Sequence, residues 1–153
     1  MHSRVESNIP FGTSTGFLPT KGKELVETPN FTLAGRAQYS VNKNLSIGLQ
    51  GKYVGARRAT DVNDERSKAY TTFDADLQLD LTDLGLKDMM LQLNAINLFE
   101  RDYLGAIATA QTNAITVLDT DPVTAGNQSA TGRAPLYSVG APQTFQIQLK
   151  AKF

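Results

Sequence analysis

Cysteine and tryptophan are absent from this chain of 153 residues, and histidine occurs only once. Without cysteine there can be no disulfide, no thiolate zinc site, no iron–sulfur cluster and no cysteine nucleophile. The one histidine, His2, lies beside the N-terminus, where chains are usually poorly ordered. A Ser-His-Asp triad or a multi-histidine metal site is therefore not expected. We predict a protein that is not an enzyme and needs no cofactor.

An excess of charge of one sign and a long apolar run are missing as well. The 15 Lys and Arg residues balance the 15 Asp and Glu residues, whereas nucleic-acid-binding proteins usually carry a basic patch and a high pI. No stretch reaches the roughly 18–20 apolar residues of a membrane-spanning helix. Residues 1–10 do not show the basic segment and apolar segment of a signal peptide. We expect no nucleic-acid partner and no transmembrane helix.

Apolar and polar residues alternate with a period of two in five long segments, which is typical of strands with one apolar and one polar face. The segments are about 9–11 residues long, longer than common strands and long enough to cross a bilayer at a tilt. A soluble β-sandwich also has alternating strands, so the pattern alone leaves both folds open. The predicted strands are about 31–41, 45–56, 70–82, 89–103 and 142–153.

The connections between these strands alternate strictly in length. Residues 41–44 and 82–88 are short links, whereas 8–30, 56–69 and 101–141 are long and polar. Outer-membrane barrels have short periplasmic turns and long extracellular loops, whereas a sandwich has no reason to place every long loop at one end. The spacing therefore favours a barrel. A small complete barrel, such as an outer-membrane enzyme, would need about eight strands, more than the sequence offers.

Several short motifs follow one another along the chain. Residues 97–103 read Asn-Leu-Phe-Glu-Arg-Asp-Tyr, residues 53–58 read Tyr-Val-Gly-Ala-Arg-Arg, and residues 140–144 read Gly-Ala-Pro-Gln-Thr. With the terminal Phe153, they resemble the NLF-(D/E)-x-x-Y, Y-x-G-x-R and G-x-P-R-T motifs of TonB-dependent outer-membrane receptors. Gln143 stands where this family usually has arginine. The resemblance extends over nearly the whole chain, in the family's order and spacing.

The resemblance implies an all-β fold, an antiparallel transmembrane β-barrel meander of about 5–6 long strands out of a 22-stranded barrel. Residues 1–153 would be a C-terminal fragment of the barrel, lacking the signal peptide, TonB box and plug. It implies part of a receptor for energy-coupled uptake of an iron-siderophore, cobalamin or carbohydrate in the outer membrane of a Gram-negative bacterium. The implied partners are outer-membrane lipid and lipopolysaccharide, the plug domain, the TonB complex, the outer-membrane assembly machinery and a small-molecule ligand. The alternative is a soluble β-sandwich ligand-binding module.

The candidate site residues form three groups. Guanidinium groups on the long loops suit anionic chelates or phosphates, and these ligand-binding candidates are Arg57, Arg58 and Arg133. In a barrel, the polar faces of the strands would line the lumen, and these residues are Arg36, Gln38, Gln50, Lys52, Asp74, Asp76, Gln78, Asp80, Gln92, Asn94, Gln146, Gln148 and Lys150. The resemblance implies a terminal signal for assembly, formed by Phe145, Ile147, Leu149, Ala151 and Phe153.

Simpler roles stay open for the polar residues. The lumenal set could merely solvate the wall and pair across strands, for example Lys52 with an aspartate of the 70–82 strand. The loop arginines could be solvated charges. Residues 61–65 carry oxygen ligands that suit Ca²⁺ but lack the spacing of an EF-hand, so we expect a turn there and no metal site.

Overall fold

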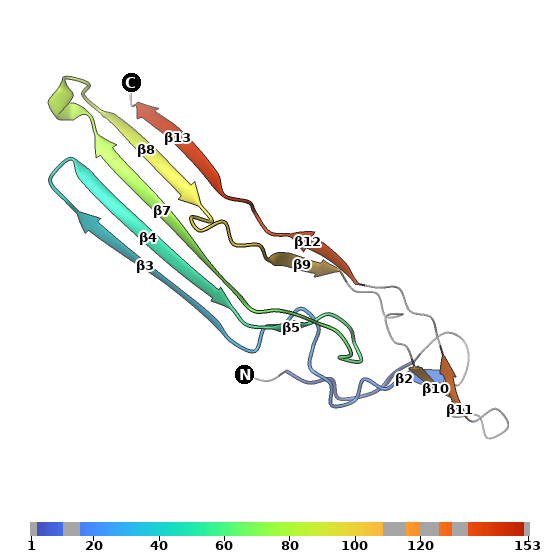
Figure 1. The fold of residues 1–153 in the computed structure, drawn as a ribbon. Helices are drawn as coiled ribbons and strands as arrows, with labels where there is room; N and C mark the ends of the chain where they lie inside the picture. Colours follow the sequence, from blue (N-terminus) through green and yellow to red (C-terminus); the bar gives the residue numbers. More distant parts are fainter. Residues whose placement is uncertain (1–2, 11–15, 109–115, 120–125, 130–134, 152–153) are drawn as a thin grey trace. The chain divides into compact units, whose positions relative to one another are not determined.

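The computed structural model describes residues 3–10, 16–108, 116–119, 126–129 and 135–151 (Figure 1). The regular structure within these ranges consists of strands and one short 3₁₀ turn. No helix within these ranges is long and apolar enough to cross a membrane. The chain divides into two compact units, each built from three separate stretches. The first comprises Met1–Phe31, Gly55–Ala69 and Leu104–Val139, and the second comprises Thr32–Val54, Tyr70–Tyr103 and Gly140–Phe153.

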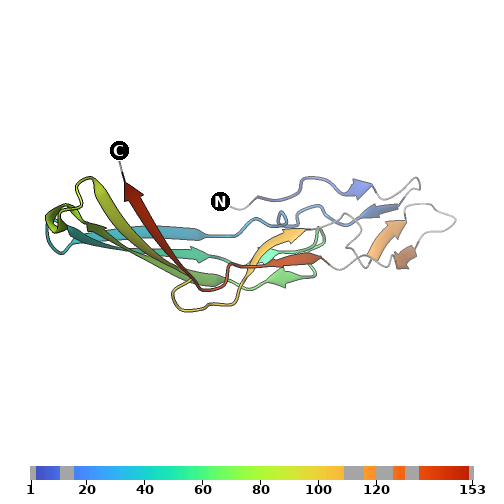
Figure 2. The same cartoon turned by 90° about the horizontal axis from the view of Figure 1, so that it is seen from above.

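The second unit is a single sheet of five strands in the order β13-β8-β7-β4-β3, in which every neighbouring pair is antiparallel. Chain order and sheet order agree along these five strands, so the sheet is a meander, and Figure 2 shows that it twists, with β13 steeply inclined relative to β3. The predicted all-β antiparallel fold is thus confirmed. The strands are β3 (Thr32–Ser40), β4 (Leu45–Val54), β7 (Tyr70–Asp80), β8 (Met89–Ile96) and β13 (Thr144–Ala151).

The pairing register places apolar residues opposite apolar residues across the sheet. Leu77 on β7 lies opposite Ile47 on β4 and Leu93 on β8, and Leu93 in turn lies opposite Ile147 on β13. Side chains alternate between the two faces of a sheet, so residues opposite one another share a face. The register therefore separates an apolar face from a polar face, and a slip of one residue in any strand would reverse its faces.

Both short connections lie at the same end of this sheet. In the first, Asn42 Oδ1 accepts hydrogen bonds from the backbone N–H groups of Asn44 (2.9 Å) and Leu45 (2.8 Å). The second contains the 3₁₀ turn η1 (Thr82–Leu84), which ends at Gly85 with a φ of 83°. Asp83 joins the two turns through Lys43 Nζ (2.7 Å) and Asn44 Nδ2 (2.7 Å), and these contacts lower its pKa. The long passages of the chain leave the sheet at its opposite end.

The strands end earlier than the sequence pattern indicated at one important place. The strand expected over 89–103 ends at Ile96, because Asn97 takes a left-handed backbone conformation with a φ of 51°. A turn follows, in which the backbone N–H of Glu100 donates to the carbonyl oxygen of Asn97 at 2.8 Å. This turn replaces the continuation of the strand.

The first unit contains short strands where the sequence suggested only loops. Among the described residues they form three small sheets. Leu18 and Ala59 in this unit are fully buried, and Ile107 is nearly so. One sheet pairs β5 (Arg57–Arg58) with β6 (Arg66–Ser67), a second pairs β9 (Leu104–Ala108) with β12 (Leu136–Val139), and the third contains β1 (Ile9–Pro10), β2 (Gly16–Leu18), β10 (Thr116–Asp119) and β11 (Gly126–Ser129).

Candidate functional site

The candidate site is the polar face of the five-stranded sheet. Asp76 lies opposite Gly48 on one side and Asn94 on the other, and Asn94 lies opposite Gln146. Rows of this kind continue along the sheet, so the register brings every predicted lumenal side chain to this face. They are Arg36, Gln38, Gln50, Lys52, Asp74, Asp76, Gln78, Asp80, Gln92, Asn94, Gln146, Gln148 and Lys150.

Hydrogen bonds connect these polar side chains within and across strands. Arg36 Nη2 lies 2.7 Å from Asp76 Oδ1, and the Asp76 side chain is only 10% exposed. Gln92 donates from Nε2 to Asn94 Oδ1 at 2.8 Å, and its Oε1 accepts a hydrogen bond from Lys150 Nζ at 2.8 Å. The polar groups therefore satisfy one another while keeping further donors and acceptors available for a polar solute or peptide.

One expected pairing differs in the structure. Asp76 of β7 forms an ion pair with Arg36. Lys52, the partner suggested by the sequence, lies directly opposite Thr72 instead. The Arg36 side chain is long enough to reach Asp76 across β4. Gly48 of β4 lies between the two residues and has no side chain to block the contact. Within the described ranges, no group of three acidic or histidine side chains converges as a metal site would require.

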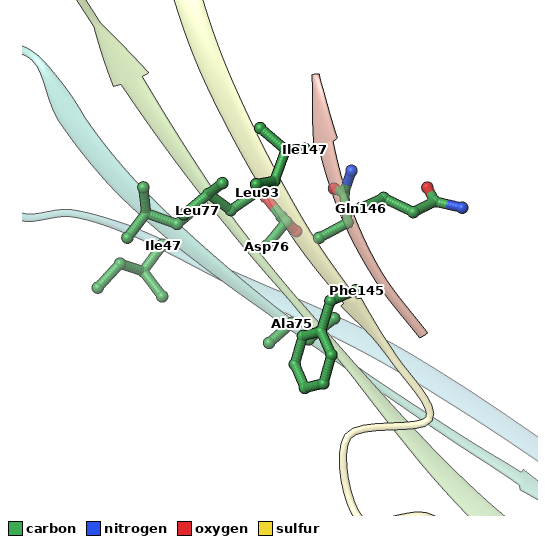
Figure 3. A pocket seen from close by; sticks show the side chains of 10 residues that line it. Ile47, Ala75, Asp76, Leu77, Leu93, Phe145, Gln146 and Ile147 are labelled. Atoms are coloured by element: carbon green, nitrogen blue, oxygen red, sulfur yellow. The ribbon is translucent and has the colours of Figure 1, made fainter. Parts of the chain in front are cut away.

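The opposite face of the sheet is apolar and open. Ile147 is 75% exposed, Phe145 70% and Leu33 61%, values far from those of a protein core. Figure 3 shows Leu77, Leu93 and Ile147 together on this side, where they line a shallow apolar groove of about 360 Å³. A soluble protein rarely leaves so large a contiguous apolar surface exposed, so this face requires an apolar environment.

The terminal pattern predicted as an assembly signal lies on this apolar face as far as the structure describes it. Phe145, Ile147, Leu149 and Ala151 lie opposite the apolar-face residues of β8. Phe153 lies outside the described residues. The role of this pattern in assembly stays a prediction.

Arg57, one of the ligand-binding candidates, is a buried part of the first unit and not a solvated loop charge. Its side chain donates from Nη1 to the carbonyl oxygen of Gly105 at 2.8 Å and from Nη2 to that of Leu104 at 2.6 Å. The residue is 8% exposed. Arg57 thus ties β5 to the start of β9, and its predicted ligand role stays a prediction beside this structural one.

Arg58, the second candidate, is partly exposed and also has a partner in the protein. Its Nε lies 2.6 Å from Glu24 Oε2, and its Nη1 donates to the carbonyl oxygen of Asn63 at 3.5 Å. The third candidate, Arg133, lies outside the described residues. The structure therefore does not bring the three arginines together, and their ligand role stays a prediction.

Residues 61–64 form a turn in the first unit. Asn63 has a φ of 62°, its Oδ1 accepts the backbone N–H of Glu24 at 2.7 Å, and its Nδ2 donates to the carbonyl oxygen of Glu24 at 2.9 Å. The Thr60 hydroxyl donates to Asp64 Oδ1. Burial raises the pKa of Asp61. The side chains of Thr60, Asn63 and Asp64 organise the turn itself, and a turn is what the sequence predicted here.

A tyrosine–carboxylate contact joins two further segments of the first unit. The hydroxyl of Tyr137 on β12 donates to Glu65 Oε1 at 2.5 Å. Burial, and then the hydrogen bond and negative charge of Glu65, raise the pKa of Tyr137 to about 12. Sequence reasoning missed this pair, because Tyr137 belongs to a stretch that carried no strand pattern.

The motif at residues 97–103 has a structural role that the sequence did not indicate. Asn97 is 3% exposed, and its backbone N–H donates to Asp74 Oδ1 on β7 at 2.8 Å. The aromatic residues of the motif also pack on β7, where Tyr103 stacks on Tyr70 and Phe99 meets Phe73 edge to face. The motif residues that carried the family resemblance are thus engaged with the sheet itself.

An open antiparallel sheet with one polar face and one exposed apolar face has the architecture of a transmembrane β-barrel wall.

No family model and no curated protein matches the chain. Several solved structures do match. The open form of the ferric-catecholate import receptor Fiu from E. coli K12 has a TM-score of 0.51 and 21% identity, over 80% of this chain and 15% of Fiu. The closed form of Fiu has a TM-score of 0.55 and 21% identity, over 84% of this chain and 15% of Fiu.

A mutant of the ferric enterobactin receptor PfeA from Pseudomonas aeruginosa is also similar (TM-score 0.53, 19% identity, 82% of this chain and 17% of PfeA). The chain thus spans 15–17% of the length of these receptors. At this level of identity the comparison establishes the fold alone, an antiparallel sheet arranged like part of these receptors, as the resemblance to TonB-dependent receptors predicted.

Proposed function

We propose that this chain is part of the barrel wall of a TonB-dependent outer-membrane receptor of a Gram-negative bacterium, which takes up a scarce ligand by energy-coupled transport. The observation that carries the proposal is the open apolar face, on which Phe145 and Ile147 are at least 70% exposed. In water such a face is an aggregation hazard, whereas lipid covers it favourably. The soluble β-sandwich alternative is not favoured, because its apolar faces would be buried against each other.

The polar face would line the lumen of the barrel. Charges there, such as Lys52 and Asp74, face water or the plug domain, whereas the same charges toward lipid would each cost roughly 2–4 kcal/mol at the midplane. Fiu is named for ferric catecholates and PfeA for ferric enterobactin, so an iron-siderophore is the first ligand to test, before cobalamin and carbohydrate. Arg57, Arg58 and Arg133 remain the candidate contacts for an anionic ligand.

The remaining partners follow from the same proposal. Outer-membrane lipid and lipopolysaccharide would surround the apolar face, and the plug domain and TonB complex would act with the complete receptor. The outer-membrane assembly machinery would read the terminal pattern that ends in Phe153. Deleting Phe153 should lower the amount of receptor in the outer membrane and leave the ligand affinity of each inserted molecule unchanged. Normal insertion with weakened affinity would contradict this role.

The lipid-facing assignment can be tested with single cysteines, because this chain contains none of its own and any cysteine elsewhere in the complete protein can be replaced by serine beforehand. Ile147→Cys and Gln148→Cys place a spin label on opposite faces of β13 in the complete protein, reconstituted in phospholipid vesicles. The measurement is the relaxation of each spin label by two paramagnetic reagents. The label at position 147 should be relaxed mainly by oxygen, which concentrates in lipid, and the label at position 148 mainly by a water-soluble nickel chelate. Equal exposure of both labels to the nickel chelate would remove the membrane assignment.

The ligand requires a separate measurement. Cells that lack their other siderophore receptors and express the complete protein should accumulate radioactive iron supplied as a ferric catecholate, and uptake should stop when TonB is deleted. If the spin labels show the expected lipid and water exposure but no iron is taken up, the barrel assignment is retained and the siderophore is rejected as the ligand. Cobalamin and carbohydrates would then be tested.

A further inference from the structure

The strand β13 needs a device that fixes its register, because no short turn does so. The pairs β3–β4 and β7–β8 are each joined by one short connection, residues 41–44 and residues 81–88, and short connections set the register of a hairpin. In contrast, β8 ends at Ile96 and its neighbour β13 begins only at Thr144. A slip of one residue along β8 would turn Ile147 to the polar face and Gln148 to the apolar face.

Asn97, which directly follows β8, bonds to three separate segments. Its Nδ2 group donates to the carbonyl oxygens of Arg101 and Ala141, both at 3.0 Å, and its Oδ1 accepts the backbone N–H of Arg101 at 2.9 Å. Its own backbone N–H donates to Asp74 Oδ1. One buried residue therefore contacts three segments: its backbone N–H bonds to β7, and its side chain joins the turn after β8 to the segment that leads into β13.

Two further contacts hold the same segment. Gln143 Nε2 donates to the carbonyl oxygen of Leu98 at 2.8 Å. The backbone N–H of Gly140 donates to the carbonyl oxygen of Tyr103 at 2.8 Å, and the Tyr103 hydroxyl accepts the N–H of Ala141 at 3.2 Å. A Cβ at Gly140 would lie within 2.4 Å of several atoms of the Tyr103 ring, so only glycine fits against this ring.

We infer that this cluster, formed by Asn97, Tyr103, Gly140, Ala141 and Gln143, sets the register of β13 on β8. The cluster lies next to the first rung of the pair, where Thr144 is opposite Ile96. One residue of slip moves a strand by about 3.4 Å, which would carry the Ala141 carbonyl out of reach of Asn97. Only the observed register satisfies the cluster. This inference does not depend on the ligand or on the proposed transport function.

The test uses cysteine pairs in the complete protein, which report register as disulfides. Leu93→Cys with Ile147→Cys joins residues that lie opposite in the observed register, whereas Leu93→Cys with Gln146→Cys joins residues on opposite faces. Trypsin cleaves after Lys87, Arg101, Arg133 and Lys150, so mass spectrometry of the unreduced digest identifies each linked peptide pair. Each cysteine pair is combined with Asn97→Ala, with Gln143→Ala and with the control Asn94→Ala, which removes an amide of the polar face outside the cluster.

In the otherwise wild-type protein and with Asn94→Ala, we expect the 93–147 disulfide to form in high yield and the 93–146 disulfide to form hardly at all. With Asn97→Ala, the ratio of the 93–147 product to the 93–146 product should fall by about tenfold, because the buried hydrogen bond from Asn97 Nδ2 to the Ala141 carbonyl oxygen no longer favours the observed register. Gln143→Ala should shift the ratio in the same direction by a smaller factor. An unchanged ratio in both variants would overturn the inference.

A second cysteine pair separates loss of register from loss of folding. Ala37→Cys with Leu49→Cys reports the β3–β4 pair, whose register depends on the short turn at 41–44. This disulfide should form at wild-type yield in the Asn97→Ala protein. If it is lost together with the 93–147 disulfide, Asn97 stabilises the whole sheet and the specific role in β13 register is wrong.

Discussion

Arg36 on β3 and Asp76 on β7 form an ion pair that crosses the strand lying between them. The pair passes over Gly48 of β4, whose missing side chain provides the room: a Cβ there would lie 2.5 Å from Arg36 Nη2 and in closer overlap with Asp76 Oδ1. Gln78 Nε2 also lies 3.4 Å from Asp76 Oδ2. Glycine in the interior of a strand is usually unfavourable, so this glycine is explained by the ion pair above it.

Replacing Gly48 with alanine should therefore destabilise the sheet. The added methyl group must displace the ends of the Asp76 and Arg36 side chains and so disturb their ion pair. Because these side-chain ends can move, we expect a cost of about 1 kcal/mol, the lower end of the range for overpacking. Gly35→Ala is the matched control, because a Cβ at Gly35 meets no atom within 4 Å; it should be neutral or stabilise by up to about 1 kcal/mol. Urea unfolding in detergent micelles, followed by circular dichroism, measures both.

A double-mutant cycle identifies the cause of the Gly48→Ala effect. In the Asp76→Ala background the methyl group meets no carboxylate, so most of the cost of Gly48→Ala should disappear. If Gly48→Ala and Gly35→Ala change stability equally, or if the cost persists without Asp76, the ion pair does not explain the glycine.

Lysine on the two faces of β13 should have opposite consequences for assembly. Ile147→Lys places a charge on the apolar face. Under the proposed function this face meets lipid, where a lysine costs up to about 2–4 kcal/mol at the midplane, so the variant should lower the amount of protein in the outer membrane. Gln148→Lys places the same charge on the polar face and should be tolerated. The measurement is the quantity of each variant in purified outer membranes. Equal yields would contradict the assignment of the two faces.

The buried Arg57 should matter more for folding than the partly exposed Arg58. Arg57→Ala removes two charge-assisted hydrogen bonds to carbonyl oxygens and should destabilise the first unit by about 2–4 kcal/mol, whereas the Arg58–Glu24 ion pair contributes about 0–1 kcal/mol. Hydrogen exchange at residues 104–108 should accelerate in Arg57→Ala and stay near wild type in Arg58→Ala. Arg57→Lys should not restore protection, since lysine lacks the planar fork.

The sequence was sufficient to predict the five-stranded sheet and its two faces, because period-two alternation depends only on local geometry. Leu77, Asp76 and Asn94 fall on the faces that their positions in the alternation predict. Contacts between distant stretches were not predictable in this way. Nothing local indicates that Arg57 reaches the carbonyl oxygens of Leu104 and Gly105, and the arginine was interpreted as a surface group.

The end of the strand at Ile96 could not be predicted from the motif at 97–103, although the sequence of this motif supported a family resemblance. The strand ends because Asn97 takes a left-handed conformation. The hydrogen-bond partners of Asn97 lie on β7 and in the segment before β13, far away in the sequence. Alternation weakened at this point, and the sequence was interpreted as a continuing strand to 103. A residue whose conformation is set by distant hydrogen bonds cannot be identified from its neighbours in the chain.

The Tyr137–Glu65 contact predicts a pH dependence of the first unit. The folded pKa of Tyr137 is raised from 10.0 to about 12, so folding favours the neutral phenol that donates to Glu65. The stabilisation is fully present below about pH 10 and is lost as the pH rises toward 12. Ultraviolet titration of tyrosinate, taken as the difference between the wild-type protein and Tyr137→Phe, should show one tyrosine titrating near pH 12.

A conservative variant separates the two causes of this shift. Glu65→Gln removes the negative charge and keeps a hydrogen-bond acceptor, so the pKa of Tyr137 should fall only part of the way to 10.0, because burial is the larger cause. In Tyr137→Phe the stability between pH 10 and 12 should no longer change through this group. A difference titration centred near pH 10 in the folded wild-type protein would show that Tyr137 is solvated and that its contact with Glu65 does not persist in solution.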